Sequence, residues 1–465
     1  MLFNTFDFIF IFLPITFFAF FGLGKYAGRK ASAGVLSFAS LTFYAYWDVR
    51  YVPLLLLSIL FNYSIGHLIE KASLYKRLYL FAGIAGNLSL LGYYKYTAFF
   101  LTTMNDVAGT VYSIPSIVLP LGISFFTFTQ TAYLVDAYRG ETEGCSLIDY
   151  CLFVTIFPHL IAGPIINYKN MMPQFLDKLN YRINYDNVSI GLMFFIIGLI
   201  KKVVIADSIA SGINPAFDNV IYLGFLDAWI ASLGYTMQLY FDFSGYSEMA
   251  VGLGLMFNMR LPFNFNSPYK ATSIIDFWRR WHMTLGYWVK NYLYIPMGGN
   301  RAGEFRKSLN LFVSMLLIGF WHGAGWTFIV WGALHGIALL INHQWRRWNI
   351  SLPGLVTGLL TFVLVNFLWV FFRADSITAA CHMINVMLTI PDASELTRDN
   401  IFWVTKGEKN ALIAAIILAF VGPNTQELLS EHFKPNIKWL VAAVALCIVA
   451  LFHFYRVSDF LYFQF

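Results

Sequence analysis

Charged side chains are scarce in this sequence. Asp, Glu, Lys and Arg make up only 12% of the 465 residues, whereas 58% are hydrophobic and 19% are aromatic. A soluble globular domain carries about 25% charged and about 45–50% apolar residues. A chain with so few polar side chains cannot cover itself in water, so it must meet the apolar interior of a bilayer. The sequence therefore excludes a soluble globular protein and predicts an integral membrane protein.

Several motifs of common enzyme classes are also missing. The four cysteines form no Cys-x-x-Cys pair, which argues against a zinc or redox motif. The sequence has no His-Glu-x-x-His motif and no serine nucleophile elbow, and its Gly298-Gly299-Asn300 run lacks the Gly-Lys-Ser/Thr of a phosphate loop. We therefore expect no metal site, and we expect the cysteines to behave as small apolar residues.

The net charge is modest, at +6. No basic stretch is free of hydrophobic runs, so we expect no nucleic-acid partner. Lys25, Arg29 and Lys30 follow the first apolar run instead of preceding it, so residues 6–24 are predicted to be a membrane helix and not a cleaved signal. The loop lysines and arginines predict that both termini lie outside the cytoplasm.

Apolar runs recur along the whole chain, and a spanning helix needs about 20 residues. The runs are 6–24, 33–47, 51–68, 78–101, 115–135, 150–168, 188–206, 221–241, 310–330, 353–372, 410–422 and 437–455. They predict an all-α polytopic membrane protein with about 11 or 12 spans. Several runs are short or contain Pro or Gly, which predicts broken or re-entrant segments. We find no internal repeat and expect a single domain, residues 1–465.

Residues 258–310 differ from the rest of the chain in composition. Residues 276–310 contain six basic and two acidic side chains, and Trp and Tyr are frequent there. Aromatic residues of this kind favour the membrane interface. We interpret the region as an amphipathic, partly re-entrant segment on the cytoplasmic side.

His322 is the clearest candidate for chemistry. It lies in an apolar segment rich in Gly and Trp, where ionisable groups are costly and are therefore functional candidates. Gly319 and Gly323 form a Gly-x-x-x-Gly pattern, which lets a helix or a ligand approach closely. A buried imidazole stays neutral and can act as a general base. From the residues alone, a histidine that only joins two helices is the alternative.

Three other histidines stand out. His282 could orient the first histidine or stabilise a developing oxyanion, or it could be an interfacial residue without a chemical role. His159 lies between two prolines, so a hydrogen bond at a helix break is favoured over a supporting role in catalysis. His335 follows His322 by 13 residues and is predicted to be structural.

Asp242 and Ser244 are acidic and hydroxyl candidates in the run Tyr240–Ala250. Their side chains could hydrogen-bond a catalytic histidine, or they could cap a helix that begins at this point. The residues leave both alternatives open.

Several runs together resemble the membrane-bound O-acyltransferases, and within that family the bacterial alginate O-acetyltransferase type. The resemblance covers nearly the whole chain. It is carried by Met1–Phe10, Phe157–Pro164, Gln238–Tyr246, Phe277–His282, Tyr292–Arg301, Trp321–Gly323 and Phe460–Phe465.

The resemblance implies a ring of helices with re-entrant segments around a central catalytic channel. It implies that His322 is the catalytic histidine and that His282 fills the family's second polar position. A donor made in the cytoplasm would deliver its acyl group to the site of the catalytic histidine. The group would leave toward an extracytoplasmic polysaccharide, often through a periplasmic or membrane-anchored acetyltransferase partner. We therefore expect a multi-pass protein of the bacterial inner membrane.

The predicted activity is O-acetyl transfer with acetyl-CoA as donor, an acyl carrier protein being possible, and with no permanently bound cofactor. Arg279, Arg280, Lys290 and Arg301 are candidates for holding the donor's phosphates, since Arg side chains match phosphate oxygens. Alginate is the first choice of acceptor, and cellulose, peptidoglycan or another exopolysaccharide are alternatives. A transporter or flippase is the rival class, but the internal repeat typical of transporters is absent from the sequence.

The C-terminal run Phe460–Phe465 is aromatic to its last residue. Exposed aromatics of this density indicate a partner or a groove. We predict that this tail folds back into the external mouth of the site. Tyr462 is the residue of this tail that has a hydroxyl group. This hydroxyl could accept the acyl group and pass it on. The alternative is that the rings only plug the mouth.

Overall fold

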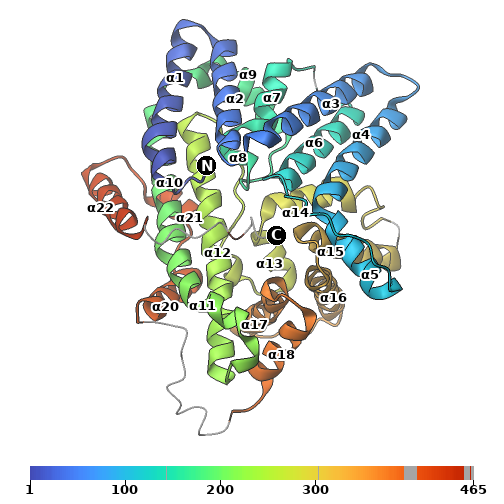
Figure 1. The fold of residues 1–465 in the computed structure, drawn as a ribbon. Coiled ribbons are helices and arrows are strands. Elements are labelled where there is room, and N and C mark those ends of the chain that lie inside the picture. Colours follow the sequence, from blue (N-terminus) through green and yellow to red (C-terminus); the bar gives the residue numbers. More distant parts are fainter. Residues whose placement is uncertain (143, 302, 392–405, 455–460, 462–465) are drawn as a thin grey trace. The chain divides into compact units, whose positions relative to one another are not determined.

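The computed structural model describes residues 1–142, 144–301, 303–391, 406–454 and 461. Within these ranges the chain forms helices joined by turns and extended links, without a β-strand (Figure 1). The chain divides into two compact units: Met1–Phe195 with Tyr246–Phe263, and Ile196–Gly245 with Asn264–Phe465. The predicted all-helical fold is confirmed.

The first unit holds the N-terminal helices. They are η1 (Asp7–Phe12), α1 (Leu13–Tyr26), α2 (Arg29–Ala45), η2 (Val49–Tyr51), α3 (Val52–Lys71), α4 (Lys76–Leu91), η3 (Gly92–Tyr96), α5 (Thr97–Ala108), α6 (Ile123–Tyr138), α7 (Leu147–Thr155), α8 (Phe157–Leu160), α9 (Tyr168–Leu176), η4 (Lys178–Tyr181) and most of α10 (Tyr185–Ile200). Phe3 and Phe8 are fully buried, 5.6 Å and 5.8 Å from the ring of Phe43. The opening aromatic run of the sequence therefore forms part of this core.

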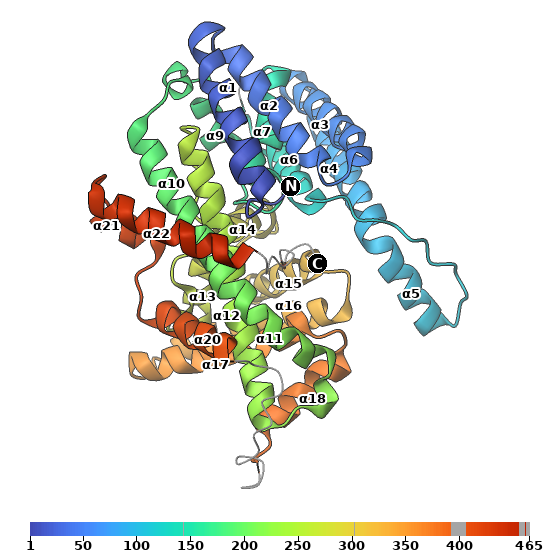
Figure 2. The same ribbon diagram turned by 60° about the vertical axis from the view of Figure 1, so that its left-hand side comes forward.

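The second unit holds the remaining helices, and α12 contributes to both units. They are η5 (Lys201–Ala206), α11 (Asp207–Asp218), η6 (Val220–Tyr222), α12 (Phe225–Met256), η7 (Pro268–Lys270), α13 (Ile274–Arg280), α14 (Met283–Val289), η8 (Lys290–Tyr294), α15 (Glu304–His322), α16 (Trp326–Arg347), α17 (Gly354–Arg373), α18 (Ile377–Leu388), α20 (Lys406–Phe420), α21 (Thr425–His432) and α22 (Ile437–His453) (Figure 2). The basic region consists of short helices here, as expected for a segment that does not span.

Within the described ranges, five helical stretches are long and apolar enough to cross a membrane. They are Asp7–Tyr26, Val49–Lys71, Tyr185–Asp218, Trp326–Arg347 and Gly354–Arg373. The pair Gly407–Phe420 and Thr425–His432, bent by 62°, would make a sixth. This is fewer than the predicted number, because several apolar runs are divided among shorter helices. The run 150–168, for example, contains α7 and the one-turn helix α8.

Large apolar side chains cover the outer surface of these stretches. Leu355 and Leu359 on α17 are 87% and 62% exposed, Phe18 on α1 is 70% exposed and Leu57 on α3 is 65% exposed. Apolar surface of this extent is stable when lipid covers it. The protein is therefore a multi-pass membrane protein.

The prediction of one span at 310–330 is wrong, because the chain forms two helices there. Helix α15 ends at His322 and α16 begins at Trp326, and glycines, which are poor helix formers, occupy positions 323 and 325. The two helices pack closely where Gly319 faces Gly332. A Cβ atom on Gly319 would lie 2.9 Å from the Gly332 Cα atom and would clash with the Phe328 carbonyl oxygen. The expectation that Gly319 allows a close helix approach is confirmed.

We expect Gly319→Ala to destabilise the α15–α16 pair by about 1–3 kcal/mol, the usual cost of overpacking. Thermal unfolding of the purified protein in detergent measures the effect. Gly22→Ala is the matched control, because a Cβ on Gly22 in α1 would meet no atom within 4 Å. Equal unfolding temperatures for the two variants would contradict the close packing.

Candidate active site

His322 is the last residue of α15 and is buried, with 4% of its surface exposed. Its ring is enclosed by other aromatic rings. The Trp331 and Phe372 centroids lie 5.3 Å and 5.2 Å away, at steep angles of 89° and 73°, and Trp321 lies 4.9 Å away. The end of α15 thus presents an imidazole inside an aromatic enclosure.

Trp331 connects this histidine with a larger set of rings. It stacks on Trp369 at 5.6 Å and lies 4.6 Å from His335, one turn further along α16. Trp369 in turn contacts Trp281 at 4.9 Å. The sequence reasoning did not single out Trp331 or Trp369. The four-residue spacing of Trp331 and His335, which places both on one helix face, is the signal that could have indicated Trp331.

His335 is fully buried, and its Nδ1 atom accepts a hydrogen bond from Trp278 Nε1 at 3.2 Å. The tautomer therefore carries its proton on Nε2. This hydrogen bond ties α13 to α16, which is the kind of contact that a structural role of His335 predicts.

His282 precedes α14 in a left-handed conformation, with φ 44° and ψ 54°. Such strain in a non-glycine residue persists only where surrounding contacts enforce it. The His282 Nδ1 atom lies 3.1 Å from Asn264 Oδ1, which also accepts from the Thr284 backbone N–H at 3.3 Å and the Thr284 hydroxyl at 2.6 Å. Because the backbone N–H can only donate, the amide oxygen faces this side, and His282 Nδ1 must donate as well.

This hydrogen bond decides what His282 can do. With the proton on Nδ1, the Nε2 atom carries a lone pair and acts as an acceptor. Burial also lowers the pKa of His282 to about 3, so the ring is neutral at physiological pH. A neutral ring in this tautomer cannot donate to an oxyanion from Nε2. The oxyanion role expected as one possibility is therefore not supported, and an orienting role remains.

His159 belongs to the first unit and is fully buried. Its Nδ1 lies 2.7 Å from the Pro164 carbonyl oxygen, and its Nε2 lies 3.1 Å from the Thr129 hydroxyl. Since a carbonyl only accepts, Nδ1 donates and Nε2 accepts. The favoured interpretation, a hydrogen bond at the helix break, is confirmed.

Asp242 occupies neither of its two expected roles. It lies inside α12, which begins at Phe225, so it caps no helix. One carboxylate oxygen is 2.6 Å from Lys202 Nζ, and the other accepts from the Leu461 N–H at 3.2 Å. The expected bond to a catalytic histidine is therefore wrong for Asp242. The buried Ser244 hydroxyl also lacks a hydrogen-bond partner within the described ranges.

Arg279 lines an open cavity of about 630 Å³ in the second unit, together with Arg346. The other lining residues are Thr272, Ser273, Ile275, Asp276, Asn342, Trp345, Ile350, Ser351, Leu352, Thr357, Leu360 and Thr361. Arg280 instead donates from Nε to Asp276 at 2.9 Å. Lys290 and Arg301 are exposed outside this lining. Of the four predicted phosphate contacts, the structure thus places Arg279 at a cavity.

The predicted acyl relay, Tyr462, lies outside the described residues.

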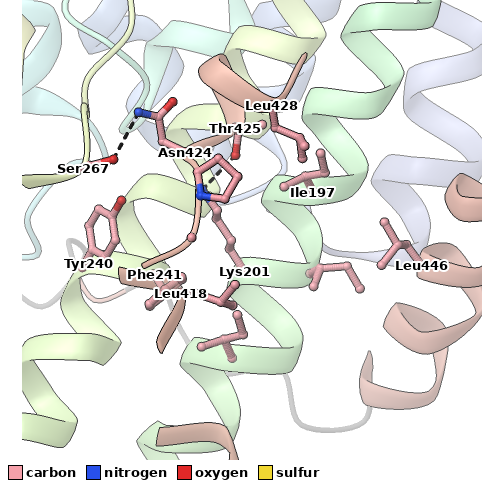
Figure 3. A pocket seen from close by; sticks show the side chains of 14 residues that line it. Ile197, Lys201, Tyr240, Phe241, Ser267, Leu418, Asn424, Thr425, Leu428 and Leu446 are labelled. Atoms are coloured by element: carbon pink, nitrogen blue, oxygen red, sulfur yellow. Dashed lines mark hydrogen bonds between the residues drawn. The ribbon is translucent and has the colours of Figure 1, made fainter. Parts of the chain in front are cut away.

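A second cavity of about 310 Å³ is mostly apolar (Figure 3). It is lined from α12 by Tyr240 and Phe241 and from α22 by Leu446. Its polar edge includes Lys201, which donates to the Thr425 hydroxyl at 2.9 Å. Apolar walls suit hydrocarbon better than a phosphate-bearing donor, so the cavity beside Arg279 is the better candidate for a nucleotide donor.

Comparison with known proteins gives a consistent picture. The membrane-bound O-acyltransferase family model matches residues 41–374, a range that includes His282 and His322. A peptidoglycan O-acetyltransferase of Helicobacter pylori is 43% identical over 100% of this chain and 98% of its own. A probable alginate O-acetylase of Pseudomonas aeruginosa is 41% identical over 91% of this chain and 81% of its own. A teichoic acid D-alanyltransferase of Bacillus subtilis is 28% identical over 49% of this chain and 60% of its own.

We expect Asn264→Ala to destabilise the second unit by about 2 kcal/mol, because it leaves buried donors of His282 and Thr284 without their acceptor. Thermal unfolding in detergent measures the change. Asn170→Ala, at an exposed position on α9, should unfold like the wild type. If Asn264→Ala also unfolded at the wild-type temperature, the tautomer assigned to His282 would be wrong.

Proposed function

The chain belongs to the membrane-bound O-acyltransferase family, and we propose that it moves an acetyl group from cytoplasmic acetyl-CoA to an extracytoplasmic polysaccharide. The observation that carries this proposal is the buried, aromatic-enclosed His322 at the end of α15. A general base works best where it is neutral and held in place. The proposed location is the bacterial inner membrane.

In the proposed reaction, an imidazole nitrogen of His322 takes the proton of an acceptor hydroxyl. The hydroxyl oxygen then attacks the thioester carbonyl, and a carbon–oxygen bond forms. The carbon–sulfur bond breaks, and the thiolate of CoA leaves with the proton that the imidazole returns. The aromatic rings around His322 exclude water and so limit hydrolysis of the donor.

His282 takes an orienting part in this scheme. Asn264 accepts a hydrogen bond from the His282 Nδ1 atom and so holds the orientation of the ring. Arg279 and Arg346 line the cavity that we assign to the CoA phosphates. Arg guanidinium groups suit this task because they bind phosphate oxygens in a bidentate manner. Arg280, Lys290 and Arg301 stay as proposed outer contacts for the same donor.

We propose peptidoglycan as the acceptor in preference to alginate, which was the first choice from the sequence. Similarity to the H. pylori peptidoglycan O-acetyltransferase extends over 100% of this chain, whereas similarity to the P. aeruginosa alginate O-acetylase extends over 91%. Both acceptors present sugar hydroxyls outside the cytoplasm, so one transfer chemistry serves either. We propose that a periplasmic or membrane-anchored partner completes the transfer, with the hydroxyl of Tyr462 as relay.

We expect His322→Ala to lower acetylation by about a hundredfold or more, since a general base contributes this much. Peptidoglycan and exopolysaccharide are isolated from cells that carry only the variant, and their O-acetyl groups are measured by NMR. His382→Ala, at an exposed position on α18, is the control and should acetylate normally. Normal O-acetyl content with a well-expressed His322→Ala protein would refute the assignment, and the polymer that loses acetyl groups identifies the acceptor.

We expect the double variant Arg279→Ala, Arg346→Ala to raise the apparent KM for acetyl-CoA by about fivefold, because charge-assisted phosphate contacts are lost. The difference should shrink in high salt, which screens exposed charges. Arg306→Ala, an exposed arginine on α15 outside the cavity, is the matched control. An unchanged KM for acetyl-CoA in the double variant would show that the donor does not bind in this cavity.

A further inference from the structure

The second unit contains a buried cluster of three charged side chains that the proposed reaction does not use. Lys202 Nζ lies 2.6 Å from an oxygen of Asp242 and 2.7 Å from an oxygen of Asp207. Each of these side chains is at most 2% exposed. Desolvating an ion costs several kcal/mol, and apolar residues of similar volume often replace a buried pair without loss of stability. Stability alone therefore does not account for the cluster.

The backbone builds this cluster from two directions. Lys202 belongs to the π-helical turn η5, and Asp207 follows this turn as the first residue of α11, where its N–H bonds to the Lys202 carbonyl oxygen. This i→i+5 pattern brings side chains five residues apart onto one face. Helix α12 approaches the same turn at Gly245, where a Cβ would lie 2.7 Å from the Gly198 carbonyl oxygen and 3.0 Å from the Lys201 Cβ atom. Asp242 lies one turn before this contact.

The second oxygen of Asp242 contacts the C-terminal part of the chain. It accepts a hydrogen bond from the Leu461 backbone N–H at 3.2 Å, across 219 positions of sequence. Leu461 itself is buried, with 4% of its surface exposed. One lysine is shared by two carboxylates. A backbone N–H donor is the group that such a carboxylate binds well.

We propose that Asp242, supported by Lys202, is a positioning residue that anchors the chain at Leu461. Lys202 holds one oxygen of the carboxylate and so directs the other toward the Leu461 amide. The group that Asp242 binds is thus a backbone amide of the same chain. The consequence of this anchor for acetyl transfer rests on the proposed function, in which the residue that follows Leu461, Tyr462, is the acyl relay.

Hydrogen–deuterium exchange of the purified protein tests the anchor without any need for activity. The Leu461 amide should exchange slowly in the wild type and about tenfold faster in Asp242→Ala, which removes its charged acceptor. Asp242→Asn keeps an acceptor oxygen and should retain most of the protection. Asp207→Asn leaves the Asp242 carboxylate in place and should also keep the amide slow.

Two measurements separate the anchor from a folding defect. Peptides from the α15–α16 pair report the fold in the same experiment and should exchange as in the wild type. The triple variant Lys202→Met, Asp207→Asn, Asp242→Leu removes all three charges, so that no buried carboxylate is left without its cation. It should fold, and its Leu461 amide should exchange fast. Wild-type protection of Leu461 in folded Asp242→Ala or in the triple variant would overturn the proposal.

Kinetics test the consequence for transfer. In Asp242→Ala the apparent KM for acetyl-CoA should stay unchanged while the rate of acetyl transfer falls, because donor binding does not involve the anchor. The positioning role would be wrong if the Leu461 amide exchanged fast in Asp242→Ala while the rate of acetyl transfer stayed at the wild-type value. If the wild type itself transfers no acetyl group, the proposed function fails, and the exchange result still decides on the anchor.

Discussion

The structure depends on the rule that a polar group taken into an apolar interior must find its partner within the protein. His159 meets this rule at a helix break, where Pro164 and Thr129 occupy both ring nitrogens. His335 meets it by tying Trp278 to α16. His282 meets it through Asn264, and that bond fixes the tautomer of the ring. The same requirement thus fixes which ring nitrogen carries the proton in each of these three histidines.

Close backbone packing is what places these groups. Gly319 and Gly332 let α15 and α16 approach until their backbones touch, and His322 ends the first of these helices against Trp331 of the second. Gly245 has the same effect between α12 and the π-turn, where Lys202 and Asp242 meet. In both places a glycine on one helix allows a charged or titratable side chain nearby to be held by its neighbours.

The sequence predicted the all-helical membrane class, the burial of His322 and the hydrogen bond of His159 at a helix break, because composition and local motifs encode them. It did not predict that residues 310–330 form two helices, since their apolar run continues through Gly323 and Gly325. It also missed the partner of Asp242. Lys202 is 40 positions away and Leu461 is 219 positions away, and no local pattern reports a contact over such a separation. The role of Asn264 was missed for the same reason, because only the folded chain shows that its amide oxygen fixes the proton of His282.

The central claim is that this chain breaks the thioester of an acyl donor at a buried histidine, which a transporter would not do. The direct measurement is incubation of the purified protein with acetyl-CoA labelled in its acetyl group, followed by separation of CoA from the label. The account predicts release of free CoA with the label on an acceptor, on the protein or in acetate. Intact acetyl-CoA after incubation with folded protein and an added glycan acceptor would contradict it.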